Sequence, residues 1–391
     1  MAECVSSAPV SAGHDPGISA SSSVTGPTGP CTREWHGGAF RGTVLIVVEN
    51  RPAMHRLLLL AAILLLPAAA PPPAVPIYRQ FGRWLVACDN TRACVARGFD
   101  EVTRAQLDLV RPAGEARPTL VLSAADAFDV AALRLDGRPL PLPDPAWSKT
   151  TENVSTDDPA VIEAFVALAR DAHTITLDQA PRGDDAARTI PLDGFTAALL
   201  LMDAVQGRPG TATALVAARG PAATPQALPV PQSPRWTPSP PLTGPEKEKL
   251  VLRASRLRSP AFGSCDVHEP PAVFALDAGN ALAIRPCYMA AYQGSSVVAV
   301  LPRSGGPDRP VKLALPGVPN DATDGPDMVD PEFDPATGTL STVSKGRGLA
   351  DCGSSETWVW SGGEFRLKAL SYQGQCGGTE PGDWPTLFRT R

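Results

Sequence analysis

The stretch best suited to bind or act on a ligand is Lys345-Gly-Arg347-Gly-Leu-Ala-Asp351-Cys352-Gly353. Its glycines allow the backbone to approach a ligand closely, and the side chains of Lys345 and Arg347 suit an anion. The residue order differs from the G-x-x-x-x-G-K-[ST] phosphate loop. The same stretch also predicts a tight turn in which Arg347 pairs with Asp351 beside a disulfide. The sequence leaves both interpretations open.

Two further candidate ligand-binding residues are Trp358 and Trp360, which alternate along a predicted strand and therefore share one face. Exposed indole rings stack on sugars or peptides, whereas the same rings turned inward form part of a core. The sequence alone does not decide between a binding surface and an aromatic core.

Metal binding and histidine-based catalysis have little support. Cys265-Asp-Val-His268 has the spacing of half a zinc site, but no second pair of ligands stands near it. The histidines after Met54 are His55, His173 and His268, and neither a G-x-S-x-G nor an H-E-x-x-H motif is present. We therefore expect no metal and no cofactor, and the question of an enzyme stays open with a non-catalytic role favoured.

Six cysteines follow the amino-terminal region, and an even number in an exported chain indicates disulfides. Six cysteines allow 15 pairings. The spacing favours the three local ones, because each pair is close in the chain and falls in one predicted hairpin region. The predicted bridges are Cys88–Cys94, Cys265–Cys287 and Cys352–Cys376.

An apolar run at residues 57–66 has the length of the hydrophobic part of a secretory signal and is too short to span a bilayer. Met54 and a basic flank precede it, and small residues follow, so residues 54–74 are predicted to be a signal peptide. We expect a periplasmic protein without a stable transmembrane span in its mature form.

Residues 1–53 are rich in Ser, Gly and Pro, and a signal so far inside a chain is unusual. The simplest explanation is that translation begins at Met54 and the preceding residues reflect a misassigned start. The alternatives are a disordered tail ahead of a short membrane anchor, or a cytosolic protein with an apolar helix.

Composition limits the fold and the partners. The chain has 391 residues, with 43 prolines and 34 glycines, so turns are abundant and long helical bundles are poor candidates. Its 35 Lys and Arg against 40 Asp and Glu give a net charge of −5, which argues against nucleic acid as a partner. The expected partner is an envelope protein or a ligand of unknown class.

Residues 77–220 are predicted to form an amino-terminal β-rich domain with two helices. A strand over residues 81–88 is followed by turn residues and a return strand from Cys94. One helix begins at Asp158-Pro159, since aspartate caps helices and proline suits the first turn. The second covers residues 194–206, and residues 211–217 are expected to form a closing strand.

Residues 221–249 are predicted to be a Pro-rich linker, because residues 221–245 contain nine prolines. Residues 250–391 are predicted to be an all-β carboxy-terminal domain. Its three hairpin loops are expected at residues 277–280, 334–338 and 361–363. The predicted fold class is therefore a β-rich α+β protein with two domains.

Five strings together resemble a known family: F-G-R-W-L-V-A-C-D-N-T-R-A-C at 81–94, the segment 194–217, K-G-R-G-L-A-D-C-G at 345–353, W-V-W-S-G-G-E-F at 358–365 and W-P-T-L-F-R-T at 384–390. The chain resembles the bacterial exported family catalogued as domain of unknown function 1176, over roughly residues 78–391. The first block is similar, more faintly, to the invasion-associated locus B proteins. The resemblance implies a periplasmic, disulfide-bonded protein and no particular activity.

Three functions are carried forward. The first is a non-catalytic periplasmic protein that binds a partner or supports the envelope. The second is an envelope hydrolase with its site near Lys345, Arg347 and Asp351, and the third is a secreted inhibitor or host-interaction factor. A polar cleft joining charged residues of both blocks would favour the enzyme, and an exposed aromatic patch or sheet edge would favour a binding protein.

Overall fold

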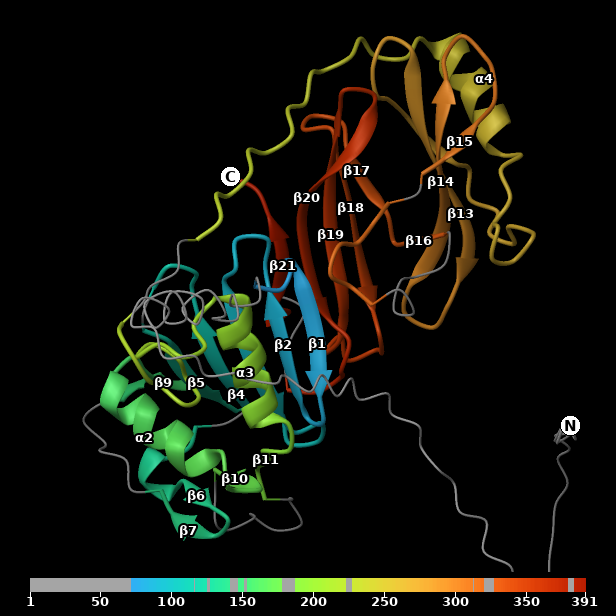
Figure 1. Cartoon of the computed structure of the whole chain (residues 1–391). Coiled ribbons are helices and arrows are strands. Elements are labelled where there is room, and N and C mark those ends of the chain that lie inside the picture. The colour runs from blue at the N-terminus through green and yellow to red at the C-terminus, as the bar shows by residue number, and fades with distance from the viewer. Residues whose placement is uncertain are drawn as a thin grey trace, which may run out of the picture. The chain divides into compact units, whose positions relative to one another are not determined.

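Antiparallel β-sheets and three α-helices make up the described part of the chain (Figure 1). The computed structural model describes residues 72–115, 117–124, 127–140, 147–150, 153–177, 187–222, 227–311, 313–319, 327–378 and 383–391. Residues 1–71, which include all but the last three residues of the predicted signal peptide, lie outside this part. The prediction of a β-rich chain with few helices is confirmed.

The first block contains a sheet of seven strands and a smaller sheet of four. In spatial order the seven are β1 (Ile77–Phe81), β2 (Trp84–Cys88), β3 (Cys94–Phe99), β4 (Gln106–Arg111), β5 (Thr119–Ser123), β9 (Asn153–Thr156) and β8 (Ser148–Lys149). The four are β11 (Thr189–Pro191), β10 (Thr174–Thr176), β6 (Arg134–Leu135) and β7 (Arg138–Pro139), with a short 3-10 helix at Val130–Ala132.

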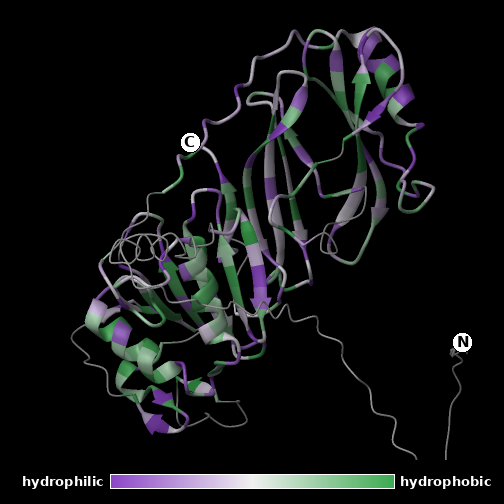
Figure 2. Ribbon diagram, in the orientation of Figure 1, coloured by the Kyte–Doolittle hydropathy of each residue, from purple (hydrophilic) through white to green (hydrophobic). Residues whose placement is uncertain are grey.

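Both helices predicted in the first block are present, α2 (Pro159–Ala169) and α3 (Phe195–Val205). Asp158 caps α2, its carboxylate accepting the N–H groups of Ala160 and Val161. The two helices are largely hydrophobic (Figure 2) and share one core with β2 to β5. Burying this apolar surface is the main stabilisation of the block.

Trp84 fixes how closely α3 and the sheet pack. It is fully buried, its ring lies 4.8 Å from that of Phe195, and its Nε1 donates to the carbonyl of Pro191 at 2.9 Å. Gly98 lies opposite Trp84 on β3, and a Cβ there would come within 2.3 Å of the indole ring. The large tryptophan therefore requires a residue without a side chain on the neighbouring strand.

The second block contains two further sheets. One has β12 (Ala272–Ala275), β13 (Asn280–Met289), β14 (Gly294–Pro302) and β15 (Arg309–Pro310), with β16 (Met328–Val329) also pairing with β14. The other has β17 (Glu332–Asp334), β18 (Thr339–Lys345), β19 (Gly353–Ser361), β20 (Glu364–Gln373) and β21 (Thr386–Arg389). All three predicted hairpins are confirmed.

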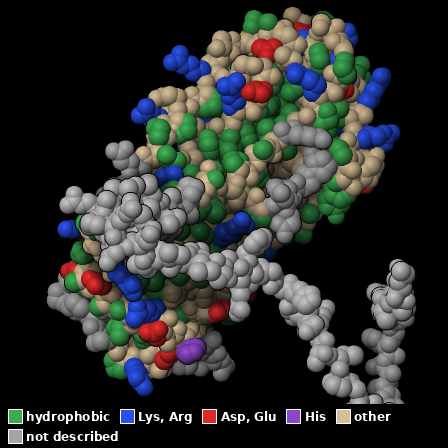
Figure 3. Space-filling model, viewed as in Figure 1, with side chains coloured by type: hydrophobic (Ala, Val, Ile, Leu, Met, Phe, Trp, Pro, Cys, Tyr) green, Lys and Arg blue, Asp and Glu red, His purple; other side chains and the backbone are tan. Residues whose placement is uncertain are grey.

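Hydrophobic residues from these two sheets form a shared core that is only partly closed to solvent. Leu282, Val300 and Leu340 are buried in it, while Phe274, Met328 and Leu367 at its margin stay half-buried. On the face shown in Figure 3, hydrophobic side chains gather over this part of the molecule. The core of the second block is therefore aromatic and aliphatic, with part of its apolar surface accessible.

The prediction that the second block is all-β is wrong, because it begins with a helix, α4 (Gly244–Ala254). The carboxylate of Glu246 accepts the N–H of Thr243 at 3.2 Å, which satisfies a donor at the helix start. Glu246 also pairs with Arg303 at 2.6 Å. The helix therefore replaces the last residues of the predicted linker, because the T-x-x-E cap prevails over the prolines that precede it.

The closing strand expected at residues 211–217 is also wrong. This segment is a series of turns, and the carboxylate of Asp203 accepts the backbone N–H groups of Leu215 and Val216 at 2.8 and 3.1 Å. The buried carboxylate of Asp203 on α3 thus accepts backbone N–H groups that would otherwise have to pair with a neighbouring strand.

The two blocks contact one another directly. Tyr78 and Leu85 of the first block share a hydrophobic cluster with Leu370, Tyr372 and Leu387 of the second. Residues 69–391 accordingly form one compact unit. The two separate domains expected from the Pro-rich linker stay a prediction.

The linker is held at several points along the described residues 227–243, where it contains no helix or strand. The N–H of Ser233 donates to the carbonyl of Arg391 at 2.8 Å, and the N–H of Arg391 donates to that of Pro231 at 3.0 Å. Trp236 packs over Gly338, where a Cβ would lie 2.2 Å from its ring. The linker is thus fastened to the carboxy-terminal sheet.

Among the residues that the structure describes, no helix has the length and apolar character needed to cross a membrane.

Cleavage of the linker should leave the two blocks associated. Arg235 is exposed and precedes Trp236, so trypsin should cut there. Because the shared cluster around Tyr78 and Leu370 persists after cleavage, the fragments should elute together in gel filtration and separate only in denaturant. An Arg235→Gln variant should resist this cut. Separate elution without denaturant would show that the blocks fold and stand independently.

Candidate functional site

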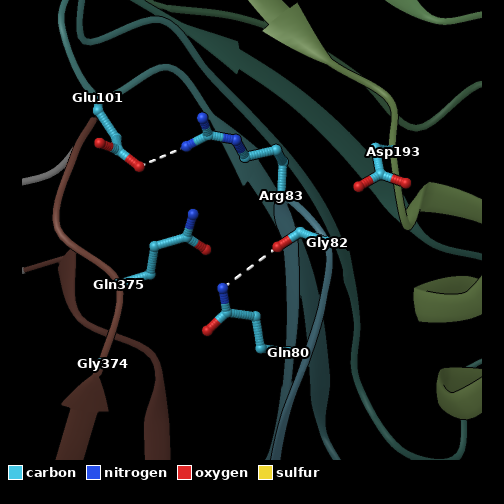
Figure 4. A pocket seen from close by; sticks show the side chains of 7 residues that line it. All are labelled: Gln80, Gly82, Arg83, Glu101, Asp193, Gly374 and Gln375. Atoms are coloured by element: carbon cyan, nitrogen blue, oxygen red, sulfur yellow. Dashed lines mark hydrogen bonds and ion pairs between the residues drawn. The ribbon is translucent and has the colours of Figure 1, made fainter. Parts of the chain in front are cut away.

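A polar cleft lies where the two blocks meet (Figure 4). Its volume is about 520 Å³, and it is lined by Gln80, Gly82, Arg83, Glu101, Asp193, Gly374 and Gln375. Residues of the β1–β2 turn, the turn after β3 and the start of α3 come from the first block, and the loop after β20 comes from the second. The size suits a small molecule or part of a chain-like ligand.

Two glycines allow the β1–β2 turn to lie directly against the start of α3. Gly82 has a φ of +52°, and a Cβ there would lie 2.0 Å from the carboxylate of Asp193. A Cβ at Gly194 would lie 1.7 Å from the carbonyl of Phe81. The N–H of Arg83 donates to the carbonyl of Asp193 at 3.0 Å. This packing sets the position of Arg83 and Asp193 in the cleft.

The cleft presents an ion pair and two side-chain amides. Arg83 pairs with Glu101, and both side chains remain about half exposed, at 50% and 46%. Figure 4 shows Arg83 between Glu101 and Asp193, with Gln375 pointing towards it from the opposite wall. Among the residues that the structure describes, the Oε1 atom of Gln375 has no hydrogen-bond partner, and it is buried. A ligand would reach this acceptor when the Gln375 side chain turns into the cleft.

Gln373, which is fully buried, holds the loop that forms the second wall. Its Nε2 donates to the carbonyls of Asp351 and Gln375 at 3.1 Å and of Gly377 at 3.3 Å. The Cys352–Cys376 disulfide fastens the same loop covalently. The other two predicted bridges, Cys88–Cys94 and Cys265–Cys287, are also present, so the local pairing is confirmed.

Arg97 connects Gln373 to the first block. Its Nη1 donates to Oε1 of Gln373 at 2.9 Å and to the carbonyl of Asp383 at 2.8 Å. Its Nε and Nη2 donate to the two carboxylate oxygens of Asp108 at 2.8 and 2.7 Å. Every guanidinium nitrogen thus has a partner, and the ion pair beneath the cleft is buried.

Tyr78 supports the loop from the β1 side. Its hydroxyl accepts the N–H of Gly374 at 3.0 Å, and its ring lies 4.7 Å from that of Tyr372. Burial raises the pKa of the Tyr78 phenol to about 12. The phenol therefore stays protonated far above neutral pH.

Of the predicted site residues, Arg347 and Asp351 come together and Lys345 does not join them. Nε of Arg347 donates to Asp351 at 2.7 Å, and a second bond joins Nη2 to the other carboxylate oxygen. This hydrogen bonding lowers the pKa of the Asp351 carboxyl and raises that of the Arg347 guanidinium, to which Glu101 also contributes. The stretch forms a turn with an Arg–Asp pair beside a disulfide, next to the cleft.

Trp358 and Trp360 are part of the core and do not form a binding surface. They are 3% and 4% exposed, within the cluster that joins the two sheets of the second block. Nε1 of Trp360 donates to Asp277 at 3.0 Å. Their side of β19 faces the neighbouring sheet. The alternation of residues along one strand shows that the two tryptophans share a face, but it does not show whether that face is buried.

One group of potential metal ligands occurs among the described residues, formed by Asp351, Cys352 and Cys376. Both cysteines are in a disulfide and therefore cannot supply thiolates, and the Asp351 carboxylate is bound by Arg347. This group does not fit a metal ion.

Sequence reasoning missed the residues that line the cleft. Gly82-Arg83 lies within the F-G-R-W string, and a glycine at a turn was the signal available there. Glu101, Asp193 and Gln375 have no motif around them, and only the folded chain brings them together.

A family model described as protein of unknown function (DUF1176) matches residues 78–391. The chain belongs to the DUF1176 family. It is similar to the uncharacterized protein YpfG of Escherichia coli (strain K12), with 32% identity over 334 residues that cover 81% of this chain and 94% of YpfG. No solved structure matches the chain significantly. The resemblance inferred from the sequence strings is confirmed, and the polar cleft lies within the part that the DUF1176 family covers.

Breaking the buried ion pair should cost much more stability than breaking the exposed one. Arg97→Met leaves the Asp108 carboxylate buried without its partner, so the free energy of unfolding should fall by about 3–5 kcal/mol. Arg83→Met should change it by no more than ~1 kcal/mol, because solvent screens the pair with Glu101. Urea denaturation of both variants gives the comparison. Equal, small losses would mean that Arg97 does not connect the blocks.

Tyr78 should make the protein sensitive to alkali. Its pKa is about 12 in the folded chain and about 10 when unfolded, so folding favours the protonated phenol. The stability that this group contributes is fully present below pH 10 and is lost as the pH rises towards 12, by up to about 2.7 kcal/mol. In urea titrations at these pH values, Tyr78→Phe should lose this dependence, and Tyr292→Phe, at an exposed ring, should keep it. An unchanged dependence in Tyr78→Phe would contradict the assignment.

Proposed function

We propose that this DUF1176 protein is an exported, non-catalytic periplasmic protein whose polar cleft binds a small polar ligand. The apolar run at 57–66 after Met54 supports export, and so do the three disulfides, which persist in oxidising compartments. The observation that carries the proposal is the unpartnered Gln375 acceptor in a cleft lined by amides and an ion pair.

The chemistry of the lining supports binding of a hydroxyl- or amide-rich ligand. Gln80, Gln375, the Arg83–Glu101 pair and Asp193 offer planar groups that donate and accept hydrogen bonds side by side. Such groups match the alternating donors and acceptors of sugar hydroxyls and peptide amides. Two carboxylates in the lining, Glu101 and Asp193, are the groups that would serve an acid, base or nucleophile, and Glu101 is paired with Arg83.

The hydrolase hypothesis near Lys345, Arg347 and Asp351 has less support. Both oxygens of the Asp351 carboxylate are held by Arg347, and its side chain is only 6% exposed. A carboxylate bound in this way is poorly placed to take a proton from a substrate. We therefore assign Arg347 and Asp351 a role in shaping the turn beside the cleft.

A second candidate function is docking of another protein, as a secreted inhibitor or host-interaction factor would require. The tip of the β13–β14 hairpin, residues 288–292, is exposed along its whole length and reads Tyr-Met-Ala-Ala-Tyr. Phe262 stacks on Tyr288 with ring centroids 4.9 Å apart, and both rings are about half exposed. Aromatic residues and methionine are enriched in protein interfaces.

Ligand capture with matched variants tests the cleft. Mature protein is incubated with periplasmic extract and washed, and bound small molecules are identified by mass spectrometry. The affinity for the captured compound should fall at least tenfold in an Arg83→Ala/Gln375→Ala variant, because two ligand contacts are lost. Arg366→Ala should leave it unchanged, since that residue forms another exposed pair, with Glu364. Equal affinity in all three proteins would exclude the cleft. Proteins captured from the same extract are identified alongside, and a protein lost only in Met289→Asp would favour docking at the hairpin tip.

A further inference from the structure

Two arginines are fully buried at the carboxy-terminal end of α3, and one carboxylate lies between them. Arg111 and Arg208 are both 0% exposed, and Asp203 is 1% exposed. Arg111 uses its whole guanidinium, donating to Asp203 at 2.6 Å, to Gln206 at 2.5 Å and to the carbonyl of Thr213 at 3.2 Å. This first arginine is therefore fully satisfied.

The Asp203 carboxylate makes its hydrogen bonds with groups other than Arg208. One oxygen accepts from Arg111, and the other accepts the backbone N–H groups of Leu215 and Val216. Asp203 thus neutralises Arg111 and closes the turn that follows α3.

Arg208 is left with unused donors. Its Nη2 donates to the carbonyl of Glu115, whereas its Nε and Nη1 are buried and have no partner in the described part of the chain. The Nε of Arg92 is also buried and unpartnered, and the carbonyl of Arg92 accepts from Gln206 at 2.9 Å, within the same group of residues. Buried guanidinium donors without partners are rare and call for an explanation.

The net charge of this buried group is also unusual. Burial lowers the pKa of Arg208 to about 10, with repulsion from Arg111 as the next cause and attraction to Asp203 opposing it. The guanidinium still carries its proton at neutral pH. Two buried cations therefore share one carboxylate, and a buried charge without a counter-ion is strongly destabilising. A water molecule would satisfy the free N–H groups but would leave the excess charge in place.

We propose that Arg208, beside Arg111, binds a small oxyanion, either a carboxylate or a phosphate group. An oxyanion supplies both missing features, since it accepts a free donor of Arg208 and balances the charge. The Nε–H and Nη1–H donors lie on different edges of the guanidinium, so the oxyanion would bind at one of these edges through a charge-assisted hydrogen bond. Gly207 and Pro209, on either side of Arg208, are exposed, so only a short turn separates the site from solvent.

The oxyanion site is distinct from the polar cleft. Asp193 of the cleft precedes α3, whereas Arg208 follows its last residue, Val205. An α-helix rises about 1.5 Å per residue, so the two sites lie near opposite ends of the helix. The inference therefore does not depend on the proposed function of the cleft.

Anion titration of the full chain and two variants tests the site. Sodium phosphate and sodium acetate are each titrated against chloride at constant ionic strength, and binding is followed by calorimetry and by thermal unfolding. At a concentration 100 times the dissociation constant, one of these anions should raise the folded-to-unfolded ratio of the wild type about a hundredfold. If only phosphate or only acetate stabilises the protein in this way, that result identifies which oxyanion the site binds.

Arg208→Met should abolish the saturable response, and Arg219→Met, which removes an exposed arginine a few residues away, should keep it. Without anions, Arg208→Met should be at least as stable as the wild type, because it removes an unbalanced buried charge. This comparison of stability without anions tests the proposal even if anion binding by the wild type is weak. A response that never saturates and is equal in all three proteins would overturn the proposal, as would a destabilised Arg208→Met with no anion binding by the wild type.

Discussion

The buried hydrogen bonds of Arg97 and Gln373 are the interaction on which the cleft and the contact between the blocks depend. Arg97 binds Asp108 within the first sheet and Gln373 at the end of β20. Gln373 in turn binds two carbonyls of the loop beyond it and the carbonyl of Asp351 in the turn before β19. Because these groups are desolvated, losing one partner would leave others unsatisfied at a large cost. The network thus fixes the loop that carries Gln375 relative to the turn that carries Arg83.

Local chemistry in the sequence predicted the local structure. Asp158-Pro159 begins a helix, the three glycine-containing loops close hairpins, and neighbouring cysteines form disulfides. Each of these features depends on contacts within about 25 residues. The errors arose where a distant or competing contact decides the outcome. Asp203 takes the donors of residues 211–217, and the cap at Glu246 starts a helix just after a run of prolines.

The cleft could not be predicted because its residues come from four separate turns. Arg83 and Glu101 belong to hairpin turns of one sheet, and Asp193 precedes a helix. Gln375 lies on a loop that Arg97 helps to position, although Arg97 precedes it by more than 270 residues. None of these residues has a partner at a spacing that indicates chemistry. Arg347 and Asp351, in contrast, are only four residues apart, so the sequence alone predicts that they can pair. The pair forms, as the tight-turn interpretation of this stretch predicts.

Contacts of the Pro-rich segment with the second block favour a preorganised polar cleft. In Figure 1 the segment runs as an extended trace from the first block towards α4. Its backbone bonds to Arg391, and Trp236 fills the space over Gly338. Proline favours an extended backbone and loses little conformational entropy on folding, so such a segment can be held by few contacts. With the linker fastened and the Tyr78–Tyr372 cluster packed, the walls of the cleft keep one spacing. A ligand would then pay little for ordering the site, which allows a few exposed polar groups to give useful affinity.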